Sequence, residues 1–156
     1  MDYIVPKSCV IKKIAREMMY EECAFDKLRI FHRVFTWIKN NVAIEFDSKD
    51  LNPENVLKNK KGTCLALAIL MVTILRAMNF DSNEVFVLIV LHKGENPLEA
   101  LHAVTVLVFQ DGSEIAVGDF IHNDLIRTSL NSISETNELI LMFNDEVAYT
   151  PSGNVQ

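Results

Sequence analysis

The chain has 156 residues, 49% of them hydrophobic, enough to bury one core of ordinary domain size. Acidic residues outnumber basic ones by 21 to 15, and the net charge of −6 argues against a nucleic-acid partner, whose phosphates need a basic surface. The odd set of Cys9, Cys23 and Cys64 disfavours a disulfide framework and favours a reducing, cytoplasmic location. We expect no signal peptide and no membrane span, because the longest apolar run, residues 64–75, is too short.

The N-terminal part of the chain predicts two helices and a loop. Apolar residues at helical spacing predict a first helix over residues 8–23, with Ser8 as its cap. A second helix is expected to start after Asp26 and to end at residues 40–41. Residues 43–61 are polar, contain a proline and lack periodicity, which predicts a loop with one short helical turn near residues 54–58.

The most apolar segment of the chain, residues 64–78, predicts a helix that is buried on nearly every side. Segments rich in Val, Ile, Leu and Phe then predict strands over residues 84–92, 101–110, 114–120 and 138–143. Helices followed by antiparallel strands indicate an α+β fold, in which N-terminal helices and the central cysteine-bearing helix pack on an antiparallel sheet. We expect a single domain over residues 1–150 and a flexible tail over residues 151–156.

The second hairpin of this sheet carries a histidine and an aspartate. A two-residue turn at Asp111-Gly112 would set Gln110 opposite Ser113 and Val104 opposite Asp119. In that register His102 and Asp119 share one face of the sheet, roughly 7 Å apart at Cα, close enough for their side chains to hydrogen-bond. A three-residue turn would put them on opposite faces, so the prediction depends on the turn.

Cys64 stands where the buried helix starts, and there unpaired N–H groups and the helix dipole favour the thiolate. The same N–H groups can hold the oxyanion of a tetrahedral intermediate, and Gly62 allows a substrate backbone to approach closely. Cys64 as nucleophile, His102 as base and Asp119 as the carboxylate that orients the base form a possible thiol triad. Structural roles stay open for all three: an inert buried cysteine, a core histidine and a capping aspartate.

Other polar residues near the triad have weaker functional interpretations. A zinc site from Cys64 and His102 with His32 or His92 has no short ligand spacing, so we expect no metal and no cofactor. The basic run before Cys64 is more consistent with a solvated loop than with a site for an acidic substrate. His122 is a possible rim residue. Cys9 and Cys23 are expected to pack within helices.

Four local segments, in this order, resemble motifs of the transglutaminase-like superfamily, a branch of the papain-like cysteine enzymes. They are residues 35–42 (FTWIKNNV), 56–64 (VLKNKKGTC), 75–80 (LRAMNF) and 102–104 (HAV), and Asp119 falls where the family's aspartate is found. The resemblance covers roughly residues 28–121. It implies that Cys64 is the nucleophile, His102 the base and acid, and Asp119 the orienting residue.

The resemblance implies a thiol-dependent acyl-transfer enzyme, with a cysteine peptidase or amidase acting on a peptide or protein substrate as the first expectation and no membrane partner. Alternatives are a protein-glutamine cross-linking transglutaminase, an acetyl carrier of the arylamine acetyltransferase kind, and a non-catalytic binding or assembly module. The chain departs from the family pattern in three ways. Leu65 and Ala66 follow the cysteine where relatives often have a polar residue, Phe46 replaces a frequent aromatic hydroxyl, and no tryptophan precedes Asp119. The oxyanion side chain is not identified; Trp37, Asn52 and Asn55 are the residues considered.

Overall fold

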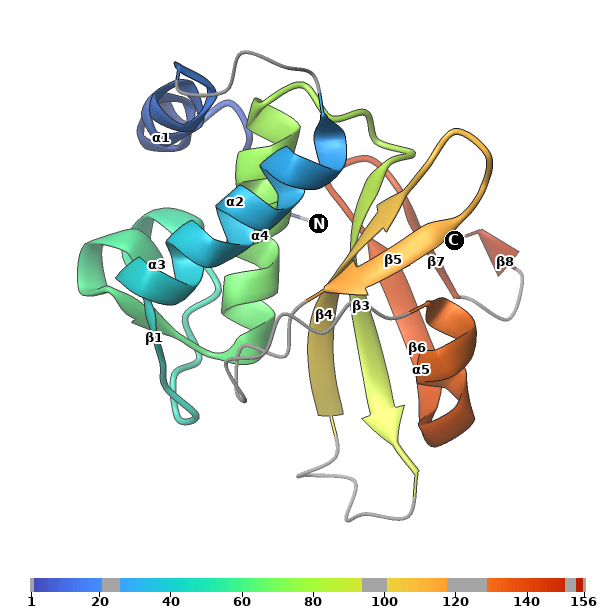
Figure 1. The fold of residues 1–156 in the computed structure, drawn as a ribbon. Coiled ribbons are helices and arrows are strands. Elements are labelled where there is room, and N and C mark those ends of the chain that lie inside the picture. The colour runs from blue at the N-terminus through green and yellow to red at the C-terminus, as the bar shows by residue number, and fades with distance from the viewer. Residues whose placement is uncertain (1, 21–25, 94–100, 118–128, 151–153, 156) are drawn as a thin grey trace.

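The computed structural model describes residues 2–20, 26–93, 101–117, 129–150 and 154–155 (Figure 1). Its helices are α1 (Cys9–Tyr20), α2 (Lys27–Asn41), α3 (Pro53–Asn59), α4 (Cys64–Ala77) and α5 (Leu130–Thr136). Its strands are β1 (Ala43–Ile44), β2 (Lys61–Gly62), β3 (Val85–His92), β4 (Leu101–Val108), β5 (Glu114–Val117), β6 (Asn137–Phe143), β7 (Ala148–Thr150) and β8 (Asn154–Val155). The fold is α+β, as the order of elements predicts.

The main sheet has six strands in the order β5-β4-β3-β6-β7-β8, and each neighbouring pair is antiparallel. The two residues of β1 and the two of β2 form a separate parallel pair. In Figure 1 the helices α1 to α4 lie to one side of the main sheet, and α5 lies near β6. The sheet is therefore covered from two sides.

Alternation along the strands divides the core into two clusters. Val85 and Val87 on β3 pack with residues of α2 and α4, whereas Phe86 and Leu88 pack with Leu130 and other residues on the α5 side. Successive strand residues point to opposite faces, so one strand supplies both clusters. The face on which a residue of β3 or β4 lies thus follows from its number.

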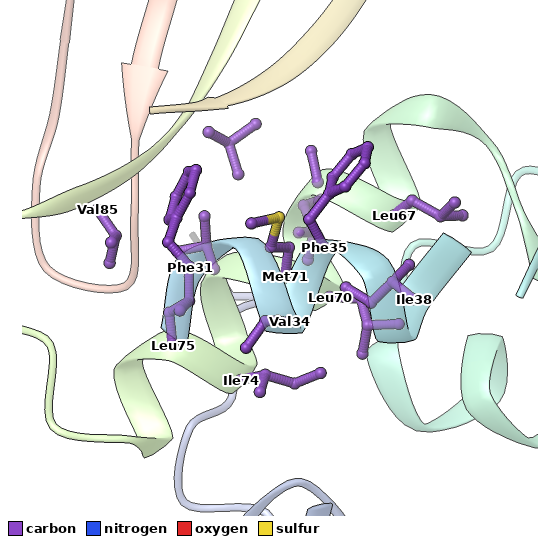
Figure 2. Packing of buried hydrophobic residues seen from close by; sticks show 14 of the residues in the cluster. Phe31, Val34, Phe35, Ile38, Leu67, Leu70, Met71, Ile74, Leu75 and Val85 are labelled. Carbon is purple, nitrogen blue, oxygen red and sulfur yellow. The ribbon is translucent and has the colours of Figure 1, made fainter. Parts of the chain in front are cut away.

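The larger cluster is built around α4, which is buried without interruption from Ala66 to Leu75. Figure 2 shows α2 crossing α4, with Phe31 and Phe35 directed into the interface beside Met71. Both phenylalanine side chains are fully buried, and each such burial contributes about 1.5–3 kcal/mol. A helix apolar on all sides needs this enclosure, and α1, α2, α3 and the sheet provide it.

A charged clamp fixes the C-terminal end of α4. Arg76 donates from Nε and Nη2 to the two carboxylate oxygens of Asp145, at 2.7 and 3.2 Å, and from Nη2 to Glu146 at 2.8 Å. Its Nη1 also donates to the carbonyl of Phe80 at 2.6 Å. The hydrogen bond to Asp145 is the main cause that raises the pKa of Arg76. The clamp ties α4 to the turn between β6 and β7.

Most predicted elements are present with small shifts of their ends. α2 begins after its cap, Asp26, and α4 begins at Cys64, as the sequence predicts. The prediction misses α5, β7 and the β1–β2 pair, and residues 154–155 of the expected tail form β8. Cys9 is exposed at the start of α1, so its predicted packing role is wrong, and Cys23 lies outside the described residues. Within the described ranges, no helix has the length and hydropathy needed to cross a membrane.

Candidate active site

Cys64 is the first residue of α4, and its thiol is free and half-buried. Thr63 caps the helix: its Oγ1 accepts a hydrogen bond from the Ala66 N–H at 3.2 Å, and its carbonyl accepts one from Leu67 at 2.9 Å. A threonine cap satisfies one of the open N–H groups of a first turn and keeps the turn in place. The sulfur therefore sits at the positive end of a long, rigidly held helix.

The chain segment that leads into Cys64 is held in place by the β1–β2 pair. The N–H of Glu45 donates to the carbonyl of Gly62 at 2.8 Å, and Lys61 forms an ion pair with Glu45 at 3.0 Å. Gly62 is buried, and a Cβ at this position would lie 3.0 Å from Leu67 and 3.1 Å from Ala66. Glycine here lets the strand pack directly on the first turn of α4. Glu45, the residue that follows β1, is thereby held against the segment that leads into Cys64.

The C-terminal end of α4 lies level with the beginning of β3 and the end of β4. Arg76 binds Asp145, and the preceding residue, Asn144, donates to the carbonyl of Val85 at 3.0 Å. Val85 pairs with Leu107 across the sheet. These contacts connect one end of the helix to one end of the two central strands.

The N-terminal end of α4 consequently lies level with the beginning of β4. About 18 Å of helix axis separate Cys64 from Arg76, at about 1.5 Å per residue. β4 rises about 17 Å between His102 and Leu107, at about 3.3 Å per residue. In Figure 1 both α4 and β4 begin towards the lower end of the molecule. Cys64 and His102 are thus at the same end of the fold.

The turn between β4 and β5 differs from the prediction. Phe109 and Ser113 close the hairpin, with the Phe109 N–H donating to the Ser113 carbonyl at 2.8 Å, so three residues form the loop. Gly112 has a positive φ of 84°, and Asp111 accepts hydrogen bonds from the N–H and hydroxyl of Ser113 at 2.9 and 2.6 Å. These bonds lower the pKa of Asp111 and favour the longer turn.

The register of the hairpin is therefore wrong by one residue in the prediction: Thr105 pairs with Val117 and Leu107 with Ile115. This removes the argument that placed His102 and Asp119 on one face of the sheet. Asp119 itself, like His122, lies outside the described residues. The described residues include Cys64 and His102, and the catalytic roles of Cys64, His102 and Asp119 all stay predictions.

The alternation of side chains along β4 also indicates the face of the sheet on which His102 lies. Ala103 and Leu107 pack in the cluster that contains α4, while Val104 and Val106 pack on the α5 side. His102 pairs with Val90, a residue of the α5-side cluster, and it is half-buried at the second position of the strand. By alternation the backbone directs His102 to the α5 side, although its level matches that of Cys64.

The other residues considered for the site have structural contacts. Trp37 is half-buried against the core, Asn52 caps α3 by accepting from Glu54 at 2.9 Å, and Asn55 donates to Asp50 at 2.9 Å. None of these contacts identifies an oxyanion donor. In the part of the chain that the structure describes, no three His, Cys, Asp or Glu side chains are grouped as metal ligands would be.

Residues 13–116 match the family model described as the transglutaminase-like superfamily. The chain belongs to this superfamily. The matched range includes Cys64 and His102, together with α2, α4, β3 and β4. No curated protein matches the chain.

Solved structures show the same fold in other proteins of low sequence identity. Legionella pneumophila LapG, EGTA-treated, has 13% identity and a TM-score of 0.69, with 94% of this chain and 87% of that chain covered. Its calcium-bound form has 12% identity and a TM-score of 0.67, with 94% and 88% covered. A candidate cysteine protease from Cytophaga hutchinsonii has 16% identity and a TM-score of 0.61, with 99% and 51% covered. This transglutaminase-like chain thus shares its architecture with these proteins.

Sequence reasoning missed the β1–β2 pair, which holds the segment leading to the cysteine. Ala43 and Ile44 contribute only two residues, too few for an alternating pattern to be recognised. The surrounding polar residues point to a loop, and residues 45–52 do lie outside helices and strands.

Proposed function

We propose that this transglutaminase-like protein is a cysteine peptidase or amidase that acts through Cys64, His102 and Asp119. The Cys64 sulfur attacks the carbonyl carbon of an amide, and the C–N bond breaks as protonated His102 gives its proton to the departing amine. Water then attacks the thioester, His102 accepts a proton from that water, and the acid leaves as the thiolate is restored. Asp119 orients the imidazole, as the aspartate of a triad does.

The observation that carries the proposal is a free, half-buried cysteine at the capped N-terminus of α4, inside the region that matches the family. The first-turn N–H groups favour negative charge on the sulfur and can stabilise an oxyanion nearby. His102 lies at the level of Cys64, and its motif resembles that of the family histidine. For the reaction to occur, the start of β4 must turn so that the imidazole reaches the sulfur.

Competitive alkylation tests the proposal because solvent accessibility and activation of the thiol predict opposite orders of labelling for Cys9 and Cys64. Cys9 is exposed and Cys64 is half-buried, so two inert thiols would react with iodoacetamide at Cys9 first. We expect Cys64 to be labelled first at pH 6, as read by peptide mass spectrometry, and His102→Ala to reverse the order. Loss of amide hydrolysis in Cys64→Ala, but not in Cys9→Ser, should accompany this. Labelling of Cys9 or Cys23 before Cys64 in the wild type would contradict an activated nucleophile.

The strand alternation at His102 favours a second candidate, a non-catalytic binding module that keeps the fold. In that case His102 is a half-buried structural residue on the α5 side of the sheet. Its replacement would then lower the stability of the protein without changing the alkylation order of the cysteines. The two candidates therefore predict different results for the same variant.

A further inference from the structure

Two large apolar side chains are unusually exposed at the end of the fold where Cys64 lies. Among the residues that the structure describes, Phe46 at 75% and Leu101 at 53% are the most exposed large hydrophobic side chains. A solvated phenyl ring gains no burial energy, and exposed apolar groups near a reactive centre are typical of a binding surface. Each is next in the chain to a part of the site described above, since Phe46 lies two residues after β1 ends and Leu101 directly precedes His102.

The β1–β2 pair brings the segment that precedes Phe46 next to the segment that leads into Cys64. Ile44 is the register partner of Gly62, and Glu45 donates its N–H to the Gly62 carbonyl at 2.8 Å. Phe46 follows directly, and paired strands are about 4.8 Å apart. The ion pair between Lys61 and Glu45 adds a second contact that holds this segment. The Phe46 side chain is thus exposed even though the residue before it, Glu45, is held in place by these contacts.

Leu101 approaches the same place from the sheet. It is two residues before Ala103, which packs in the α4-side cluster, so alternation directs Leu101 to the face of the sheet that carries α4. It is 53% exposed at the first position of β4, the end of the strand that lies level with the start of α4. Phe46 and Leu101 thus flank the N-terminal end of α4 from two sides.

We propose that Phe46 and Leu101 form an apolar rim that selects an extended peptide with a large apolar residue next to the scissile bond. The proposal rests on the proposed function, because it assigns the substrate class of the same site. The chemistry at Cys64 needs only a carbonyl, whereas an apolar rim contacts the side chain beside it. Contact of such a side chain with Phe46 or Leu101 removes apolar area from water and so stabilises the complex.

The test uses the full chain and a set of labelled peptides that differ at one position, with Phe, Leu, Ala or Asp next to the central bond. We expect kcat/KM to be about tenfold higher for the Phe and Leu peptides than for the Ala peptide. Phe46→Ser and Leu101→Ser should each remove most of this preference. Tyr3→Ser and Val10→Ser, at sites 48% and 46% exposed, are the matched controls and should keep it.

A second arm separates the rim from the reaction. Cys64→Ala, with and without Phe46→Ser, is titrated with the same peptides by fluorescence anisotropy. If the wild type cleaves none of them, a binding preference for the Phe peptide that Phe46→Ser removes would support the rim while the proposed function fails. Cleavage without any side-chain preference would overturn the rim and leave the proposed function standing. The rim is also overturned if the peptides show neither preferential cleavage nor preferential binding. The same holds if the preference is unchanged in Phe46→Ser and Leu101→Ser.

Discussion

Gly62→Ala is expected to destabilise the protein, because the space around Gly62 is already filled. The added methyl group would lie 3.0 Å from Leu67 Cδ1, 3.1 Å from Ala66 Cβ and 3.3 Å from Val56 Cγ1. All three neighbours are at most 2% exposed, so none of them can swing into solvent. Overpacking of this kind costs about 1–3 kcal/mol, and the lower entropy of the unfolded alanine chain offsets only about 0.4–1 kcal/mol of it.

Urea unfolding, followed by the fluorescence of the single tryptophan Trp37, measures this loss. The net loss of about 0.6–2 kcal/mol, with a slope of about 2 kcal/mol per molar, should lower the midpoint by roughly 0.3–1 M. Leu67→Ala removes the nearest atom, so the double variant should be less destabilised than the sum of the two single variants by at least about 0.5 kcal/mol. Leu107→Ala, a distant core change, should be additive with Gly62→Ala. A midpoint for Gly62→Ala equal to that of the wild type would refute the packing argument.

Two further predictions concern the helix cap and the sheet. Thr63→Ala should lower the free energy of unfolding by about 1 kcal/mol in the same urea assay, while Thr63→Ser keeps the hydroxyl and most of the stability; equal losses in both variants would argue against capping. Burial, and then the charge of Glu114, raise the pKa of Tyr149 above its usual value of 10.0. The tyrosine of the unfolded chain therefore ionises first as the pH rises. The stability that is present below pH 10 should fall as the pH rises through the pKa of the folded state. Urea midpoints measured on both sides of pH 10 should fall less in Tyr149→Phe than in the wild type. Tyr3→Phe, at an exposed site, serves as the control, and an equal alkaline loss in it and in Tyr149→Phe would count against the assignment.

The long periodic elements could be predicted from the sequence because their patterns report burial directly. α2 has apolar residues at helical spacing, and α4 is apolar on all sides, so their type and ends follow from the residues. Short elements carry too few residues for a pattern. α5 has seven residues with only Leu130 and Ile133 buried, and β7 has three residues, all half-buried. Ser129 caps α5, but neither element has an apolar pattern long enough to be recognised.

The candidate site likewise has one part that could be predicted from the sequence and one part that could not. The position of Cys64 at a helix start depends on local signals, Gly62 and Thr63, and the structure has it there. The relation between His102 and the next strand depends on one turn, in which Asp111 can equally enter a two-residue or a three-residue loop. The hydrogen bonds from Ser113 decide in favour of the longer loop, and the shift of one residue changes the face of every partner.

The clamp at Arg76 limits how the chain can change in length. Since the helix is anchored at one end and presents its cysteine at the other, adding or deleting one residue between Thr63 and Arg76 would rotate the sulfur by about 100° and move it by about 1.5 Å. Substitutions inside α4 can be absorbed by repacking, but insertions cannot. The number of residues between Thr63 and Arg76 thus sets the position of the thiol. This number should be kept in any redesign of the protein.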